Sequence, residues 1–417
     1  MQLQTPRNPF VTSIYTADPS AHTWDGETVY VYASHDIDPA RGCDLMDRYH
    51  IFSSKDMINW VDEGEILSSD DVKWGRPEGG FMWAPDCMYK DGTYYFYYPH
   101  PSGTQWNDTW KIGVATSKYP NKDFTDQGYI EGLGGFALID PCTFVDDDGQ
   151  AYIYIGGGGK YLGAKLKPDM MTLESDPVEM EGLFDFHEAT WVFKRNGVYY
   201  LSYSDNSQPQ NKMRYATSDS PLGPWTHKGA YLTPVGCETT HGSVMEFKGQ
   251  WYQFYHNHAV SGHGTMRSIC VDKLFFDEKG DILPIEQSQT GVWSYEIPAD
   301  AVKYSVNELQ PFGGAKICDD GTCITGLGAE GAGFKLIGAE GKGDLRATIW
   351  VRYATKERLA KIKLHVNGRD ESFINALGTD DMTRLTARLK PGADNEITFV
   401  GGHGDMNVTE VIVSYFN

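Results

Sequence analysis

Residues 140–154 read Asp140-Pro-Cys-Thr-Phe-Val-Asp-Asp-Asp-Gly149-Gln-Ala-Tyr152-Ile-Tyr154, and this pattern decides the fold. An acidic residue leads a short strand, an Asp-Gly pair follows, and a Tyr-rich strand returns. Asp-Gly suits a two-residue hairpin turn, because both central residues of that turn need a positive φ. The stretch therefore predicts a β-hairpin.

A turn glycine followed by a strand with aromatic residues occurs five times between residues 18 and 260. Counting eight or nine positions back from each glycine identifies the leading residues, which are Asp18, Trp83, Asp140, Glu188 and His241. A further strand follows the hairpin, as at 112–117 and 213–218. Repeats of this length are typical of propeller blades. We predict a five-bladed β-propeller, whose five leading residues converge on one central channel.

The composition supports an all-β chain. Its 417 residues include 46 Gly, 25 Tyr, 19 Phe and 11 Trp, which favour many short strands joined by tight turns. The formal net charge of −21 argues against nucleic acid as a partner, because nucleic-acid binding depends on Lys and Arg that neutralise phosphates. No run of about 18 apolar residues occurs, so we also expect no membrane partner.

The seven cysteines are scattered and contain no Cys-x-x-Cys pair. They indicate neither a disulfide framework nor a structural zinc site, and we expect most of them to be buried. The first residues, Met1 to Pro9, contain no apolar signal core. We therefore expect a cytoplasmic location, with a secreted or periplasmic one if a signal peptide has been trimmed.

The repeat ends near residue 284, and a stretch of different character begins near Pro298. Segments 347–353, 361–366 and 407–415 alternate apolar and polar residues, as the strands of a sandwich do. We predict two domains, a five-bladed β-propeller over residues 1–296 and a smaller, jelly-roll-like β-sandwich over residues 297–417.

Three of the five converging residues, Asp18, Asp140 and Glu188, are carboxylates. Like charges held close together raise one another's pKa, and this cost indicates a use. Hydrolysis of a glycosidic bond needs a carboxylic acid that protonates the leaving oxygen and a carboxylate on the other side of the sugar. Asp18 and Glu188 lie in the first and fourth units, well apart around the ring. This placement fits the separation of roughly 6.5–9.5 Å that an inverting enzyme needs for its water.

The residues around these carboxylates carry further expectations. Trp83 is expected to stack on the apolar face of a sugar ring, with packing inside its unit as the alternative. Arg267 either hydrogen-bonds a substrate hydroxyl or holds a carboxylate by a bidentate contact, unless it lies on the surface. Asp86 lies three residues inside the Trp83 register, and we expect it to fix the backbone of its unit. Turn formation by Asp before Pro is the alternative for Asp18 and Asp140, but it does not explain Glu188 and His241 at the same repeat position.

The chain resembles glycoside hydrolase family 43 over residues 9 to about 290. The resemblance rests on Ala17-Asp18-Pro-Ser, Trp83-Ala-Pro-Asp86, Ile139-Asp140-Pro, His187-Glu188-Ala, His241-Gly-Ser and Arg267-Ser-Ile-Cys-Val-Asp-Lys-Leu274. It implies a catalytic five-bladed propeller that inverts anomeric configuration. It also implies that Asp18 is the general base, Glu188 the general acid, and Asp140 the residue that orients the acid and raises its pKa. An ionised Asp140 close to Glu188 would push the pKa of that acid upward.

The resemblance also places His241 deep in the channel, where it faces a calcium ion or a cluster of water. With Trp83 and Arg267 we assign it to substrate binding. A hard cation prefers oxygen ligands, so one His is weak support for calcium, and both outcomes stay open. The chemistry itself requires no cofactor.

Members of the family act mostly on arabinose- and xylose-containing polymers. Trp106 and Trp110 lie in a long loop of the second unit that we expect to close one side of the channel, which favours an exo-acting pocket. We therefore expect release of terminal pentose from arabinoxylan or xylo-oligosaccharides, by α-L-arabinofuranosidase activity with β-xylosidase side activity. The alternatives are an endo-arabinanase and a non-catalytic propeller that binds glycans.

The C-terminal domain resembles family 6 carbohydrate-binding modules through Ala347-Thr-Ile-Trp350, Lys363-Leu-His-Val-Asn367-Gly368 and Asn407-Val-Thr-Glu-Val. The stretch 377–382 contains no Trp, so the aromatic residues that usually bind sugar in such modules are not evident. Sugar binding by this domain and simple packing on the propeller both stay open.

Overall fold

The structure is a computed structural model that describes residues 3–4, 8–232, 235–237, 239–285, 287–288, 291–292, 297–343, 346–357, 359–377 and 382–416. Over these residues the regular structure consists of β-strands and short 3₁₀ helices, which confirms the all-β prediction. No helix in these ranges is long and apolar enough to cross a membrane. The chain divides into two compact units, one of Ile14–Lys55 with Glu63–Val292, the other of Met1–Ser13, Asp56–Asp62 and Trp293–Asn417.

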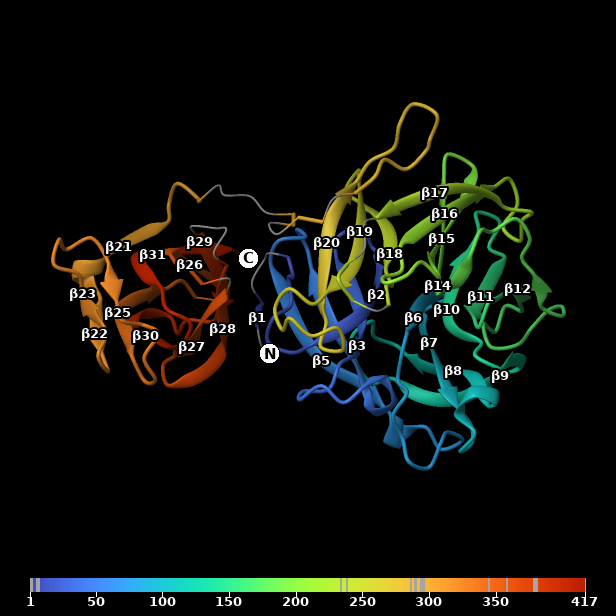
Figure 1. Cartoon of the computed structure of the whole chain (residues 1–417), viewed down its shortest axis with the longest axis horizontal. Coiled ribbons are helices and arrows are strands. Elements are labelled where there is room, and N and C mark those ends of the chain that lie inside the picture. Colours follow the sequence, from blue (N-terminus) through green and yellow to red (C-terminus); the bar gives the residue numbers. More distant parts are fainter. Residues whose placement is uncertain are drawn as a thin grey trace. The chain divides into compact units, whose positions relative to one another are not determined.

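The unit that contains Ile14–Lys55 and Glu63–Val292 is built from successive antiparallel sheets, which follow one another from blue to yellow in Figure 1. Hydrogen-bonded neighbours are mostly consecutive in sequence, as the hairpin repeat predicts. Within the described residues the sheets are β5-β4-β3-β2 (Trp60–Ser68, Arg48–Ser54, Val29–His35, Thr16–His22), β6-β7-β8-β9 (Asp86–Lys90, Thr93–Pro101, Trp110–Ser117, Thr125–Gly135), β10-β11-β12-β13 (Ile139–Val145, Ala151–Gly157, Lys160–Leu166, Val178–Glu179), β14-β15-β16-β17 (Phe186–Arg195, Val198–Asp205, Met213–Ser218, Thr226–Leu232) and β18-β19-β20 (Ser243–Phe247, Gln250–Asn257, Ser268–Leu274).

The first and last of these sheets are also neighbours. The backbone N–H of Ala21 in β2 donates to Ser243 Oγ in β18 at 3.0 Å. The backbone N–H of Thr16 donates to the carbonyl of Arg267 at 2.9 Å. The leading strands of the repeat are thereby brought to a common region of this unit (Figure 1).

The tight turns that the sequence predicts form in three of the five repeats. Lys90 pairs with Thr93 around Asp91-Gly92, and both turn residues have positive φ, 49° and 78°. The same two-residue turn joins β14 to β15 and β18 to β19. The prediction is wrong for the first and third repeats, where the connections are longer. In the third, Val145 pairs with Ala151, because Asp146 accepts the N–H of Gly149 and closes a wider turn.

Aromatic residues of the returning strands fill the space between neighbouring sheets. Tyr154, Tyr203 and Tyr255 lie on β11, β15 and β19, are fully buried, and belong to one apolar cluster. Phe193 and Tyr200 stack within it at 4.9 Å between ring centroids. Each fully buried ring of this size contributes about 1.5–3 kcal/mol, so the Tyr-rich repeat holds the sheets together.

The second unit contains two sheets. One has the order β23-β24-β31-β26-β29 with β21 on β31, and the other the order β22-β25-β30-β27-β28. Their strands are β21 (Val302–Ser305), β22 (Gln310–Phe312), β23 (Lys316–Ile317), β24 (Ile324–Thr325), β25 (Gly333–Gly341), β26 (Arg346–Ala354), β27 (Leu359–Val366), β28 (Arg369–Leu377), β29 (Met382–Ala387), β30 (Gly392–His403) and β31 (Asn407–Phe416). Both sheets contribute to one apolar cluster, in which Phe334 stacks on Phe399 at 4.4 Å.

The N-terminal residues of this unit pair with segment 56–62. Leu3–Gln4 (β1) pairs with Val61 and Trp60, and Phe10 stacks on Trp60 at 4.2 Å between ring centroids. The domain boundary predicted after residue 296 adjoins residues 293–296, which lie outside the described residues, as do residues 378–381 of the stretch inspected for binding aromatics.

Four of the seven cysteines, Cys87, Cys142, Cys237 and Cys270, are buried, which confirms the expectation for most of them. Cys43 is exposed. Cys318 and Cys323 face each other across the β23–β24 hairpin with their sulfur atoms 2.8 Å apart, a proximity that the sequence spacing did not reveal.

Candidate active site

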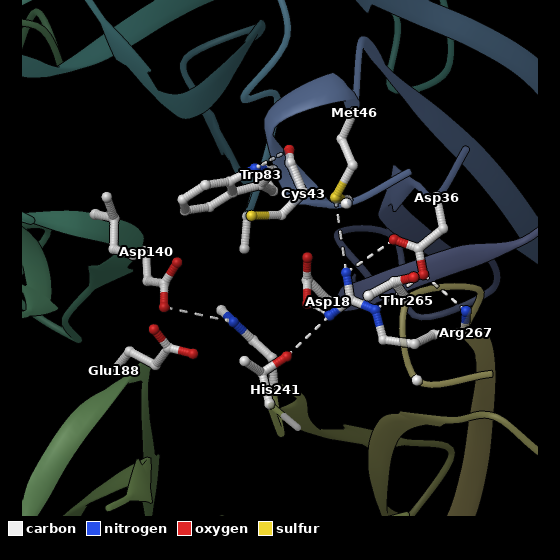
Figure 2. A pocket seen from close by; sticks show the side chains of 15 residues that line it. Asp18, Asp36, Cys43, Met46, Trp83, Asp140, Glu188, His241, Thr265 and Arg267 are labelled. Atoms are coloured by element: carbon white, nitrogen blue, oxygen red, sulfur yellow. Dashed lines mark hydrogen bonds and ion pairs between the residues drawn. The ribbon is translucent and has the colours of Figure 1, made fainter. Parts of the chain in front are cut away.

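All six residues that the sequence assigned to the site line one cavity of about 330 Å³. Figure 2 shows Asp140 and Glu188 together on one side of it, Asp18 with Arg267 on the other, and His241 between them. The five residues counted from the turn glycines therefore share one cavity, and Arg267 lies in it with them. The described residues that line the cavity are Asp18, Asp36, Gly42, Cys43, Met46, Trp83, Ala84, Ile139, Asp140, Glu188, Thr239, His241, Gly264, Thr265 and Arg267.

Each of the three carboxylates sits at a β-bulge in the first strand of its sheet. A bulge bends the strand and re-aims a side chain, and bulges are common beside active sites. The pairing register shifts between Ala17 and Ser20, between Ile139 and Cys142, and on both sides of Glu188. The bulges explain how the side chains of Asp18, Asp140 and Glu188 come to point into the cavity.

The backbone at these positions lies in the left-handed region. Asp18 and Asp140 both have a φ of 53°, and Ala189, which follows Glu188, has a φ of 66°. Such conformations cost about 1–3 kcal/mol for residues other than glycine, although Asp tolerates them better than most, and they gather at functional sites. The first and third repeats thus have a positive φ at the leading residue, and the fourth has it at the next residue.

Asp18 is a buried carboxylate held in its ionised form. Burial would raise the pKa of Asp18, but the positive charge of Arg267, with smaller effects of His241 and His256, lowers that pKa below its ordinary value. Arg267 Nη1 donates to Asp18 Oδ1 at 3.2 Å. The backbone N–H of Asp18 donates to His256 Nδ1 at 3.1 Å, while His256 Nε2 lies 2.9 Å from the Thr239 carbonyl. His256 is therefore neutral with its proton on Nε2, and it fixes the backbone of Asp18.

Arg267 is fixed by a residue that the sequence did not single out, Asp36. Arg267 donates to its carboxylate from Nε at 2.9 Å, from Nη2 at 2.8 Å and from the backbone N–H at 2.7 Å. Such a bidentate pair is both strong and directional. The bidentate contact expected for Arg267 is thus made with Asp36, and a single Nη1 bond reaches Asp18. Asp36 follows β3, outside the repeat pattern, so no local signal marks it.

Asp140 and Glu188 form a pair that binds a proton tightly. Burial raises the pKa of Asp140 well above its ordinary value, and the negative charge of Glu188 raises it further. The side chain of Asp140 is 4% exposed and that of Glu188 is 19% exposed. The sequence had led us to expect an ionised Asp140, whereas deep burial of this carboxyl favours its protonated form. The two carboxyls titrate as a pair that shares a proton.

Three neighbours position this pair. Asp140 Oδ2 accepts the backbone N–H of Ala189 at 2.7 Å, so the residue after Glu188 is tied directly to Asp140. His241 Nδ1 lies 3.6 Å from the same oxygen. His187 Nε2 lies 3.8 Å from Glu188 Oε2, and its Nδ1 is 2.9 Å from the buried Asn211 side-chain nitrogen.

His241 lies at the centre of the cavity and is neutral. Burial lowers its pKa to about 4, with Asp18 acting in the opposite direction and Arg267 in the same one. As a possible calcium ligand it offers nitrogen, which a hard cation accepts less readily than oxygen. Among the described residues no three His, Cys, Asp or Glu side chains are grouped as ligands of a metal ion. The donor set around His241 thus fits calcium poorly.

Trp83 forms the wall of the cavity next to Cys43. Its indole Nε1 donates to the Cys43 carbonyl at 2.8 Å, and its ring lies 5.0 Å from that of Trp110 between centroids. The expectation that Trp110 lies in a loop is wrong, because it begins β8 and is buried behind Trp83. The side chain of Trp106 lies outside the described residues.

Asp86 acts as a link between sheets, in line with the expectation that it fixes the backbone. Its Oδ2 accepts the N–H and the hydroxyl of Thr143 at 2.6 and 2.7 Å. Its Oδ1 accepts from Ser20 at 2.8 Å and lies 2.7 Å from His22 Nε2. Asp86 does not line the cavity with the other carboxylates.

On one side of the cavity lies Asp18, a carboxylate that stays ionised. On the other side lie Asp140 and Glu188, a pair of carboxyls that retains a proton. The ionised group can accept a proton from water, and the pair can donate one to a leaving oxygen. An acid and a base on two sides of a sugar-sized cavity are the groups that hydrolyse a glycosidic bond. The fold and the site therefore define a glycoside hydrolase.

Comparison with known proteins identifies the family. The model of the glycosyl hydrolases family 43 matches residues 6–282, and the chain belongs to this family. It is 35% identical over 332 residues to a xylosidase/arabinosidase of Bacteroides ovatus, covering 68% of this chain and 99% of that protein. It is 36% identical over 332 residues to xylosidase/arabinosidase 43A of Humicola insolens, covering 66% and 98%.

A solved structure agrees with these relatives. The family 43 β-xylosidase/α-arabinofuranosidase from a compost microbial metagenome, in complex with xylotriose, is 34% identical with a TM-score of 0.61, over 68% of this chain and 98% of that one. The chain is accordingly a glycosidase of family 43. These findings confirm the predicted family and the predicted class of enzyme.

Proposed function

We propose that the protein is an inverting, exo-acting glycosidase that releases terminal pentose from arabinoxylan or xylo-oligosaccharides. The leading activity is that of an α-L-arabinofuranosidase, with β-xylosidase side activity. The observation that carries the proposal is the opposite shift of pKa at Asp18 and Asp140, on two sides of one cavity. The relatives named xylosidase/arabinosidase support the choice of pentose.

Asp18 is the general base in this proposal. Its ionised carboxylate accepts a proton from the water that attacks the anomeric carbon. Arg267 keeps Asp18 ionised. The backbone N–H of Asp18 donates to His256, and this bond fixes the direction of the Asp18 side chain. A base must be deprotonated at the working pH, which the lowered pKa of Asp18 provides.

Glu188 is the general acid, because it is the more accessible member of the pair that shares a proton. In the form that reacts, the proton of the pair is on Glu188 and Asp140 is ionised; Asp140 also anchors the Glu188 segment through the Ala189 N–H. When Glu188 gives its proton to the leaving oxygen, the negative charge spreads over a pair that burial already penalises for being ionised. The pair regains a proton after the product leaves.

The remaining site residues bind the sugar. Trp83 offers its ring to the apolar face of the pentose, held by its bond to the Cys43 carbonyl. Neutral His241 is available to hydrogen-bond a sugar hydroxyl. Arg267 is occupied by Asp36 and Asp18, so its contribution to binding acts through Asp18. A calcium ion at His241 stays a prediction, to be tested by metal analysis of the purified protein, and no step above depends on it.

In the same proposal the five sheets are the blades of a five-bladed propeller, and the two sheets of the second unit form a β-sandwich. A solved family 43 arabinoxylan arabinofuranohydrolase from Bacillus subtilis, 24% identical, has a similar fold over 97% of this chain, with a TM-score of 0.60. Sugar binding by the sandwich stays a prediction.

The test is a panel of nitrophenyl α-L-arabinofuranoside and β-D-xyloside, with proton NMR of the first sugar released. The proposal expects pentose of inverted configuration. It also expects faster turnover of the arabinofuranoside than of the xyloside. Pentose of retained configuration would contradict it. Cleavage of linear arabinan without release of monosaccharide would favour an endo-arabinanase, and no turnover of any pentoside would favour a glycan-binding propeller.

A further inference from the structure

Two exposed phenylalanines stand at equivalent points of the repeat, in the two sheets that carry the acid pair. Phe136 precedes Asp140 by four residues, and Phe184 precedes Glu188 by four residues. They are 59% and 53% exposed. The corresponding positions before the other leading residues hold Ile14, Gly79 and the buried Cys237, so exposed rings mark the acid side alone.

Phe136 lies at the same end of its sheet as the cavity. It belongs to the connection from β9 to β10, whose next residue, Ala137, donates its N–H to the Asn107 carbonyl at 2.9 Å. Its ring lies over Gly158 in the β11–β12 turn, where an added Cβ would come within 3.4 Å of the ring. A side chain at Gly158 would therefore contact Phe136, which is largely exposed.

Phe184 precedes β14, and its backbone and ring are fixed by several contacts. Its backbone N–H donates to the Tyr203 hydroxyl at 3.1 Å, and that hydroxyl donates to its carbonyl at 3.0 Å. The Arg214 guanidinium lies 4.9 Å from the ring centroid, and the His227 ring lies 5.2 Å away. Arg214 is itself fixed by the buried Asp205. One face of Phe184 is thus backed by a fixed cation, and more than half of the residue is exposed.

The place of these rings follows from the chemistry of the acid. The acid protonates the oxygen that leaves, so the rest of the substrate must lie on the acid side of the cavity. Four residues of extended chain span at most about 14 Å, which puts both rings within reach of the sugars beyond the bond that is cleaved. A sugar ring has apolar faces that pack on an aromatic ring, and a neutral ligand suits a chain of net charge −21.

We propose that Phe136 and Phe184 form a leaving-group subsite, at which the oligosaccharide or polysaccharide chain beyond the scissile bond stacks. The inference rests on the proposed function, since it takes Glu188 as the acid. It identifies the second half of the substrate as a chain of neutral sugars with exposed apolar faces, which is the chemistry of a xylan backbone.

The test compares two substrates that release the same pentose. One is an oligosaccharide, and the other is the pentosyl fluoride, whose leaving group has no ring to stack. The change to Phe136→Ala or Phe184→Ala should lower kcat/KM for the oligosaccharide about three- to tenfold, the loss expected for one aromatic contact, and leave that for the fluoride unchanged. Phe136→Tyr and Phe184→Tyr, which keep the ring, should restore the oligosaccharide rate.

Tyr119→Ala is the matched control. Tyr119 is 49% exposed and also has a cation near its ring, Lys122 at 4.4 Å, but it follows β8 at the end of the sheet next to the Asp91-Gly92 turn, opposite the cavity. Neither substrate should respond to this change. If kcat/KM for the oligosaccharide relative to the fluoride stays unchanged in both Ala variants, the proposed subsite is wrong. This holds whether both rates are unaffected or both fall equally. A wild-type protein that fails on the fluoride itself would instead overturn the proposed function.

Discussion

Replacement of Arg267 by Gln should raise the pKa of Asp18 and so move the acidic limb of the pH–rate profile. Arg267 is the largest of the influences that lower the pKa of Asp18, and His241 and His256, with pKa values of about 4, are uncharged at neutral pH. In Arg267→Gln burial therefore acts almost alone, and it disfavours the ionised base. The variant should need a higher pH to reach its full kcat/KM.

The magnitude follows from the broken ion pairs. Removing one partner of a buried pair costs about 3–5 kcal/mol. If roughly a third of this cost falls on Asp18, its pKa rises by about one unit, because one unit corresponds to 1.36 kcal/mol. At pH values well below the new pKa the rate should fall tenfold for each unit of pH.

Arg267→Gln should also lower the free energy of unfolding. A carboxyl with a lowered pKa stabilises the fold above its ordinary pKa of about 3.9, and this contribution disappears as the pH falls through the lower folded-state pKa. Urea unfolding should therefore show a loss of about 3–5 kcal/mol for Arg267→Gln at pH 7 and a smaller loss only at pH values below about 3.9.

Arg214→Gln is the control for this experiment. Arg214 pairs with the buried Asp205 but lies outside the cavity, so the variant should lose stability and keep the pH–rate profile on a pentosyl fluoride. A folded Arg267→Gln protein whose acidic limb coincides with that of the wild type would refute the reasoning, because Asp18 would then not be the group held ionised by Arg267.

Four further changes test the other parts of the site. Glu188→Gln should lower kcat about 10²- to 10⁴-fold on natural glycosides and much less on nitrophenyl pentosides, whose leaving groups need no proton, as steady-state kinetics will show. Asp140→Asn should move the basic limb of the pH–rate profile to lower pH, since the pair then loses the charge interaction that retains its proton. Trp83→Ala should raise KM about three- to tenfold through loss of ring stacking, measured with the pentosyl fluoride. Asp86→Ala should lower the free energy of unfolding by about 1–3 kcal/mol, because it leaves the Thr143 N–H without its acceptor, and the pH–rate profile should stay unchanged.

The repeat alone predicted which residues share the cavity. The turn glycine and the two-residue period of a strand determine which residue begins each leading strand, and equivalent residues of a repeat meet in space. Asp18, Trp83, Asp140, Glu188 and His241 were found in this way. The bulges that aim the carboxylates were not, because a bulge adds one residue without altering the pattern of residue types.

Other features lie beyond such counting. Asp36 meets Arg267 across 231 positions of sequence, and the residues around it carry no periodic pattern. The raised pKa of Asp140 was not predicted, because the relative burial of two neighbours depends on packing that no local pattern encodes. The strand at Trp110 could have been predicted, since the apolar residues Trp110, Ile112 and Val114 stand at alternate positions, as in a strand.

The central claim is that Asp18 is the base that activates water on the side opposite Glu188. The most direct measurement is the turnover of an activated pentoside, such as a nitrophenyl pentoside, by Asp18→Asn. Because an activated leaving group relieves the need for the acid and not for the base, we predict a loss of about 10²- to 10⁴-fold, comparable with the loss on natural glycosides. Turnover near the wild-type rate would contradict the assignment.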